Sequence, residues 1–261
     1  MSVSLGETAV LARAVARKSL VLRVRYAFNT VTNLFTVYVL FALVVFGGRE
    51  LAPRAVEASL GGIVVGFFLL LMASVAYADL SWELIREAQW GTLEQLYMSP
   101  LGFGRVVAVK TVVNVLVSFA YGVVLLALML ATTDARLTLD PLTVLPLGAL
   151  TLCSAVGVGF ALGGLALVFR RVESVFQLVQ FAFVALIALP VGANPALKLL
   201  PLALGSHLLR RSMSAGQRLW ELPTADLGLL VVTAVVYVGA GYAVFRLGTR
   251  RARTTGRLGQ Y

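Results

Sequence analysis

Six long stretches without a charged side chain constrain this chain more than any other feature. Each has 19 or more residues free of Asp, Glu, Lys and Arg, and a helix that crosses a bilayer core needs about 20 mostly apolar residues. Strands of membrane barrels are about 10 residues long and alternate polar with apolar side chains. Residues 64–71 and 123–130 show no such alternation. The six stretches are 26–48, 58–78, 111–133, 141–169, 174–197 and 227–245. The sequence therefore predicts an all-α membrane protein, a single domain with six transmembrane helices.

Composition excludes several classes of protein. Only 13% of the 261 residues are charged and 59% are hydrophobic, whereas about 25% of a soluble domain is charged. The net charge of +10 could suit nucleic-acid binding, but it also fits a membrane protein whose positive charge lies on cytoplasmic loops. We therefore expect no nucleic-acid partner. One cysteine, Cys153, and one histidine, His207, leave little material for a disulfide framework, a metal site or a catalytic triad.

The distribution of Lys and Arg predicts the orientation. Six crossings put both termini on one side, and that side carries 15 of the 22 basic residues. Acidic residues divide evenly, which gives +9 on the side of the termini and +1 on the other. Because Lys and Arg concentrate on the cytoplasmic side, we expect both termini in the cytoplasm of a multi-pass cell-membrane protein. The expected spans are about 27–47, 59–79, 108–132, 142–169, 174–193 and 226–246.

The N-terminal segment, residues 4–25, has helical character and five basic side chains. It predicts a cytoplasmic juxtamembrane helix, although its charges do not gather on one face. A basic orientation signal without further function is the alternative. Cleavage as a signal peptide is disfavoured, because the basic region is 25 residues long and no A-x-A-like site follows the first apolar run.

Residues 82–97, between predicted spans two and three, form an amphipathic pattern. Glu83, Glu87 and Glu94 fall on one helical face beside an apolar face. Pro100 should end or bend this helix, since proline lacks a backbone N–H, and glycines follow at 102 and 104. The pattern predicts a cytoplasmic surface helix whose carboxylates pair with the N-terminal helix or face a partner. A plain polar loop helix is the alternative.

The same segment resembles the signature of the ABC-2 type permease family, the membrane subunits of ATP-binding cassette exporters. That signature is close to E-x-x-x-G-T-x-E-x-L followed shortly by S-P, between spans two and three. The resemblance covers the whole chain: the basic N-terminal helix, six spans, and an outer segment between spans five and six. The residues that carry it are Glu87, Gly91, Thr92, Leu93, Glu94, Gln95, Leu96, Ser99, Pro100 and Leu101.

The resemblance implies a function and partners. Residues 91–101 would form a coupling helix that docks on a separate ATPase subunit, with Glu87 and Glu94 bracing the N-terminal helix or the ATPase contact. It also implies a permease homodimer on two ATPases and transport out of the cell. ATP and Mg²⁺ would be bound by the ATPase, and no cofactor by this chain.

The chain itself has no phosphate-loop motif of the form G-x-x-x-x-G-K-[ST]. Ala155, Gly159 and Gly163 recur at a spacing of four inside predicted span four, and small residues at that spacing let membrane helices pack closely. None of the six spans has a central charge, and Lys110 at a span end can extend its ammonium to the interface. This favours an external motor over proton coupling. An ion-gradient-driven secondary transporter or channel remains the alternative function, and a membrane enzyme a third.

Polar residues within the spans offer two interpretations. Asn33, Asn114, Gln177 and Gln180 can form hydrogen bonds between helices, or they can line a translocation path near a dimer axis. Because the rest of the interior is Leu, Val and Phe, such a path would suit a lipid-like or amphipathic substrate. Membrane lipids are the other expected partner.

The outer segment 198–226 contains the basic residues Lys198, Arg210, Arg211 and Arg218. Its prolines disfavour a single helix, and residues 197–209 fit short re-entrant helices of the family pattern. Gly205-Ser206-His207 stands where the family has a turn of the form N-P-[LMF]. The basic side chains could attract anionic head groups or substrate. A solvated lid, with His207 as a surface residue, is the alternative.

Overall fold

The computed structural model describes residues 5–89, 103–169, 172–192 and 194–254. These residues are helical with short connections, and no strand occurs among them. The helices follow in the order α1 (Leu5–Arg25), α2 (Ala27–Ala42), η1 (Leu43–Gly47), α3 (Gly48–Leu51), α4 (Pro53–Gln89), α6 (Phe103–Thr132), α7 (Pro141–Val168), α8 (Glu173–Ala188), η2 (Pro195–Leu199), α9 (Ala203–Ala215), η3 (Leu219–Glu221) and α10 (Thr224–Thr254).

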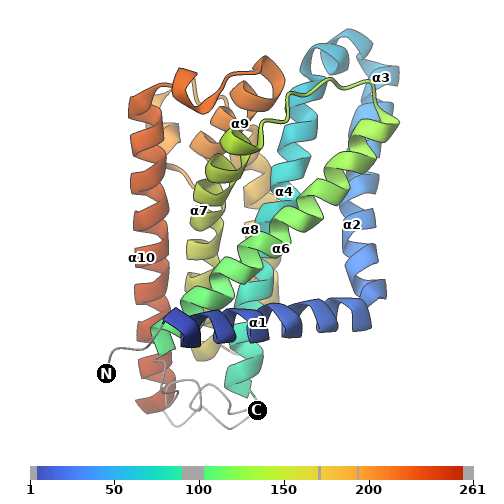
Figure 1. Ribbon diagram of the computed structural model, residues 1–261. Helices are drawn as coiled ribbons and strands as arrows, with labels where there is room; N and C mark the ends of the chain where they lie inside the picture. Colours follow the sequence, from blue (N-terminus) through green and yellow to red (C-terminus); the bar gives the residue numbers. More distant parts are fainter. Residues whose placement is uncertain (1–4, 90–102, 170–171, 193, 255–261) are drawn as a thin grey trace.

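The long helices run up and down between two ends of a bundle (Figure 1). Helix α1 lies across one end, roughly perpendicular to the others, and the C-terminal end of α10 lies at that same end. We call it the α1 end. Helices α3 and α9 lie at the opposite end, which we call the α9 end. The described parts of both termini therefore lie at the same end of the bundle.

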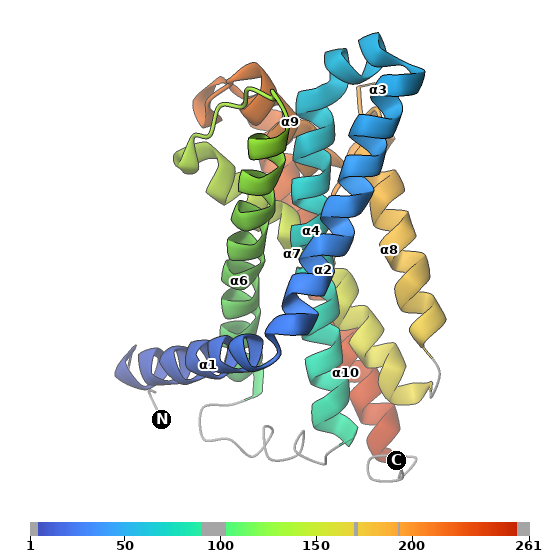
Figure 2. The ribbon, with the colours of Figure 1, turned by 90° about the vertical axis from the view of Figure 1, so that its right-hand side faces the viewer.

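Helices α4 and α7 form the centre of the bundle. In the most apolar 18-residue stretch of each helix, 61% of the residues of α4 and 72% of those of α7 are buried. The corresponding shares are 17% for the span formed by α2, η1 and α3, and 22% for α10. Helix α7 packs between α4 and α10, and α4 also contacts α6, α8 and α9. In Figure 2, α2 crosses in front of α4 and α8 lies to the right, and both are at the periphery of the bundle. The outward apolar side chains of these outer helices can face lipid or another chain.

Helices α7 and α10 approach closely through two pairs of glycines. A Cβ atom on Gly157 would overlap the Tyr237 carbonyl, and one on Gly241 would overlap the Gly157 backbone. Seven residues along each helix, Gly164 and Gly248 repeat the contact. Small residues let membrane helices approach until their backbones touch, so these four glycines determine how α7 lies against α10.

The small residues expected to pack inside span four do so on a second face of α7. Ala155 is fully buried, and a Cβ on Gly159 would lie 2.8 Å from the carbonyl oxygen of Tyr77 on α4. Ser81 of α4 donates a hydrogen bond of 2.8 Å to the Gly159 carbonyl. Helix α7 thus uses one glycine face against α4 and another against α10.

Five of the six expected spans are long enough to cross a membrane by length and composition. They are Thr30–Leu51, Pro53–Glu87, Phe103–Thr132, Pro141–Val168 and Thr224–Ala252. The fifth expected span, 174–193, is the shorter apolar helix α8, with 16 residues. It ends because Pro190 disfavours helical geometry at the preceding residue, and Leu189 has φ −59° and ψ 134°.

Helix α4 is longer than expected, with 37 residues, or about 56 Å at 1.5 Å per residue. The sequence predicts a span ending near residue 79 and a separate surface helix starting at 82, but residues 82–89 are the last two turns of α4 itself. No proline or glycine interrupts residues 67–89, and polar side chains near this end have partners on other helices. The rest of the predicted surface helix lies outside the described residues.

The outer segment begins with a short 3-10 turn, η2, and continues as α9. The two are separated at Pro201 and Leu202, whose φ of 64° lies in the left-handed region. Helix α9 has 13 residues, more than a short dipping helix, and it packs against α4 and α7. A Cβ on Gly205 would overlap the Thr151 side chain of α7, which explains why the residue here is glycine.

Candidate functional site at the junction of α1, α4 and α6

Three carboxylates line one face of α4 near the α1 end. Asp79, Glu83 and Glu87 are four residues apart, and residues at that spacing lie above one another on a helix. They face α6 and α1, which supply three basic side chains. Three negative and three positive charges therefore meet, and their formal sum is zero. We call this group the polar junction; it consists of Lys18, Arg23, Asp79, Glu83, Glu87, Lys110 and the neighbouring Tyr121.

Lys110 of α6 is the centre of the polar junction. Its ammonium forms an ion pair with Glu87 and lies 3.2 Å from Glu83 Oε1. The Lys110 and Glu87 side chains are only 7% and 10% exposed. The expectation that Lys110 extends to the membrane interface is therefore wrong: a carboxylate face on α4 gives the ammonium a partner inside the bundle. Removing one member of a buried pair leaves a costly isolated charge, so this contact holds α4 and α6 together.

Helix α1 joins the same network through Lys18. The Lys18 ammonium lies 3.5 Å from Glu83 Oε1, and their side chains are 57% and 30% exposed. Such an exposed pair contributes less than about 1 kcal/mol. Its importance is geometric, because Glu83 links a charge of α1 to Lys110 of α6.

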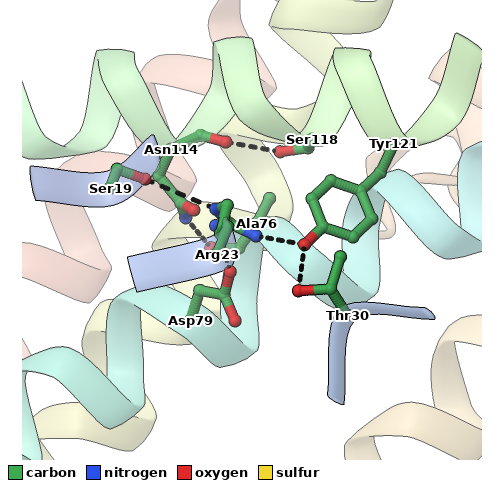
Figure 3. Close-up of polar contacts among 8 residues, drawn as sticks. All are labelled: Ser19, Arg23, Thr30, Ala76, Asp79, Asn114, Ser118 and Tyr121. Carbon is green, nitrogen blue, oxygen red and sulfur yellow. Dashed lines mark hydrogen bonds and ion pairs between the residues drawn. The ribbon is translucent and has the colours of Figure 1, made fainter. Parts of the chain in front are cut away.

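Arg23 attaches the C-terminal part of α1 more firmly (Figure 3). It donates hydrogen bonds to Asp79 Oδ2 at 2.6 Å and to the Tyr121 hydroxyl at 2.8 Å. Its guanidinium carbon also lies 4.9 Å from the Tyr121 ring centroid, within cation–π range. The Tyr121 hydroxyl in turn donates to Thr30 of α2. Burial alone lowers the pKa of Arg23, but Asp79 and Tyr121 more than offset this and raise it.

Replacing Arg23 with methionine should weaken the attachment of α1. The change removes the charge but retains most of the side-chain volume, and Asp79 is 46% exposed, so we expect a loss of about 1 kcal/mol. A double-mutant cycle with Asp79→Asn, read from thermal unfolding, should give a coupling energy of similar size. Arg17→Met, on the exposed face of the same helix, is the matched control. Equal effects of Arg23→Met and Arg17→Met would contradict this role.

The four residues proposed to line a translocation path lie in two kinds of environment. Asn114 is buried and donates a 2.8 Å hydrogen bond to the Ala76 carbonyl, as Figure 3 shows. Gln180 donates to Ser74 and accepts from the Tyr77 hydroxyl. These two residues join helices. Asn33 on α2 and Gln177 on α8 are exposed, so their side chains are accessible to a ligand or another chain.

Most of the segment expected to contact an ATPase, residues 91–101, lies outside the described residues. Its flanks are described: α4 ends at Gln89 and α6 begins at Phe103. Glu87 lies two residues before the end of α4 and pairs with Lys110, seven residues into α6. The buried ion pair therefore joins the two helices that lead into and out of this segment.

Residues 28–243 match the family model described as ABC-2 family transporter protein. The chain belongs to the ABC-2 transporter family. The match covers α2 through most of α10 and leaves α1 outside it. A search of curated proteins found no significant match. ABC-2 transporters are membrane components of transport systems and normally pair with an ABC ATPase.

Two of the four basic residues in the outer segment of this ABC-2 transporter, Arg210 and Arg211, lie on α9, at the end of the bundle opposite the polar junction. Arg210 reaches the C-terminal end of α8 and donates a 2.8 Å hydrogen bond to the Ile187 carbonyl. His207 and Arg211 are part-buried. Burial and the nearby charge of Arg211 lower the pKa of His207, so at neutral pH it adds no charge. Lys198 pairs with Asp226 at 2.6 Å.

Sequence reasoning did not place Asp79 or Arg23 in the polar junction of this transporter. It grouped Glu83 and Glu87 with Glu94, but not with Asp79, although Asp79 continues the same spacing of four toward the centre of α4. That spacing was a usable signal. Nothing in the spacing of Arg23 along α1 identifies Asp79 as its partner, because the pairing depends on where α1 crosses α4 and α6.

Proposed function

We propose that this chain is the permease of an ATP-driven exporter and forms the translocation path as a homodimer on two ATPase subunits. Residues 91–101 dock on the ATPase, with Glu87 and Glu94 near the contact. ATP and Mg²⁺ are bound by the ATPase and not by this chain. The substrate is lipid-like or amphipathic, and the α1 end faces the cytoplasm.

The observation that carries this proposal is the position of the polar junction. It connects α4 and α6, the two flanks of residues 91–101, and it attaches α1 through Lys18 and Arg23. A force applied to the segment by an ATPase therefore reaches three helices that are joined by ion pairs. Helices joined in this way move together, and rigid-body movement of this kind is a common route to alternating access.

The exposed polar residues on the outer helices support a path between two copies. Asn33 and Gln177 lie on exposed faces of α2 and α8, beside exposed apolar side chains such as Phe35 and Phe181. A path that both residues line needs a second surface to enclose it, and a second permease supplies one. Mixed polar and apolar walls suit an amphipathic substrate, since they can contact both of its parts.

The proposal is tested by co-expression with a candidate ATP-binding cassette ATPase from the same organism. We expect the two to co-purify and the reconstituted complex to hydrolyse ATP and transport. Glu94→Lys should remove both association and ATP-driven transport, because it reverses the charge at the proposed contact. Glu57→Lys, which makes the same change at an exposed site near the other end of α4, should retain both.

Two outcomes would reject the proposal. One is a monodisperse permease that binds no ATPase and whose transport is unaffected by Glu94→Lys. The other is transport in proteoliposomes that follows an ion gradient and proceeds without ATP, which would favour a secondary transporter or channel.

A further inference from the structure

Arg210 of α9 lies where three helices meet near the α9 end. Its guanidinium donates to the Ile187 carbonyl at the C-terminal end of α8. On α4 it lies beside two glycines one turn apart: a Cβ on Gly66 would be 3.6 Å from Nη2, and one on Gly62 would be 3.9 Å from Cδ. Both glycines belong to the candidate span Pro53–Glu87. A full positive charge therefore lies alongside a membrane-spanning helix.

This charge has no acidic partner within the part of the chain that the structure describes. The ion pairs there are those of Lys18, Arg23, Lys110 and Lys198, and none includes Arg210. Among the same residues, Arg210 Nε is enclosed without a hydrogen-bond partner. Enclosed polar groups in proteins are nearly always hydrogen-bonded. Arg210 as a whole is part-buried, so part of its side chain remains accessible to an acceptor from outside these residues.

Stabilising the end of α8 does not account for the whole guanidinium. The last carbonyls of a helix lack partners within it, and Ser206 and Arg210, one turn apart on α9, both bond to the Ile187 carbonyl. Stabilising this helix end accounts for the hydrogen bond that Nη2 of Arg210 donates. A serine already reaches the same carbonyl, and the Nε hydrogen remains without an acceptor.

The surroundings of Arg210 are positive. Arg211 follows it, and Lys198 is neutralised by Asp226. Burial lowers the pKa of Arg210 itself, and burial together with Arg211 keeps His207 neutral. Arg210 and Arg211 thus give this part of α9 two positive charges. An anion would be attracted to it, and a planar guanidinium matches the oxygen pair of a phosphate.

We propose that Arg210 binds a phosphate group at the α9 end of the bundle, in a site bounded by α4, α8 and α9. The site is separate from the polar junction and does not depend on which motor drives transport. A phospholipid head group of the adjacent leaflet is one source of the phosphate, because α4 crosses the membrane beside Arg210. Free phosphate is the other source.

The test uses the full-length permease purified in a neutral detergent. Phosphatidylglycerol, phosphatidylcholine and inorganic phosphate are added separately, and binding is followed by thermal unfolding and by native mass spectrometry. The variants are Arg210→Gln and, as matched control, Arg218→Gln. Arg218 also lies in the outer segment, but it is exposed and stacks on Trp220. Because α1 is basic as well, the comparison of the two variants separates the Arg210 site from other lipid contacts.

We expect the wild type and Arg218→Gln to bind phosphatidylglycerol in preference to phosphatidylcholine. Arg210→Gln should bind it about tenfold more weakly, the loss expected for one hydrogen-bonded charge. If inorganic phosphate protects the wild type as well as the lipid does, the ligand is a free anion; if only the lipid protects, it is a head group. Either result supports the site, provided that the protection is lost in Arg210→Gln.

Equal binding of phosphatidylglycerol by Arg210→Gln and Arg218→Gln would overturn the proposal. If Arg210→Gln fails to fold, Arg210→Lys keeps a positive charge but lacks the planar fork and Nε, and it should bind the anion more weakly than the wild type. Unchanged binding by Arg210→Lys would also reject the site. So would an equal affinity of the wild type for phosphatidylglycerol, inorganic phosphate and phosphatidylcholine, because the choline cation of phosphatidylcholine neutralises its phosphate.

Discussion

Gly241→Ala, which adds a single methyl group to α10, should destabilise the protein strongly. The new Cβ would overlap the Gly157 carbonyl of α7, and a backbone atom inside a packed helix cannot move aside as a side chain can. Overpacking in a core costs about 1–3 kcal/mol and sometimes more, and we expect at least the upper end of that range. Thermal unfolding of the purified protein, followed by tryptophan fluorescence, measures the effect.

Gly239 is the matched control for Gly241. It lies two residues earlier on α10, and a Cβ built there meets nothing within 4 Å. Gly239→Ala should leave the melting temperature unchanged or raise it slightly, because alanine favours a helix over glycine. Gly157→Ala, on the opposite side of the contact, should reproduce the loss seen for Gly241→Ala. If Gly241→Ala and Gly239→Ala melt at the same temperature, α7 and α10 are not in backbone contact.

Lys110→Met should be the most damaging single change in the polar junction. It removes the ammonium that faces Glu87, whose side chain is 10% exposed, and Glu83. Losing one partner of a buried ion pair costs about 3–5 kcal/mol. We expect a large fall in the melting temperature and, in the complex with an ATPase, a loss of coupling between ATP hydrolysis and transport.

Two further variants separate the loss of charge from the loss of packing. Lys110→Met combined with Glu87→Leu replaces the buried pair by apolar side chains, an exchange that is often neutral, so it should recover part of the stability that Lys110→Met loses. It should not recover coupling if the charges link α1, α4 and α6. Lys18→Met makes the same substitution at an exposed lysine and should cost under about 1 kcal/mol. An equally small effect of Lys110→Met would show that the lysine is solvated.

Much of the fold followed from local features of the sequence. The N-terminal helix was expected at residues 4–25 and is α1, Leu5–Arg25. Gaps between charges predicted six spans, and five of them are helices long enough to cross a membrane, since the cost of placing a charge in hydrocarbon depends on that residue alone. The end of α8 before residue 193 also has a local cause, Pro190. The sequence prediction missed it because the length of the span was taken from the absence of charged residues. The spacing of Glu83 and Glu87 predicted an acidic face, and the same spacing would have added Asp79.

Only the tertiary structure decided which faces and charges meet. Gly157 and Gly241 are separated by 84 positions in the chain, and their contact depends on the register and crossing of two helices. The same holds for Lys110, whose ammonium pairs with a carboxylate of α4 and does not extend to the membrane interface. It also holds for Arg210, because its lack of an acidic partner among the described residues depends on how three helices assemble. A single helix determines its own length, hydrophobicity and spacing. The partner of each side chain is determined jointly by all the helices that pack around it, because close packing leaves few arrangements in which every enclosed group is accommodated.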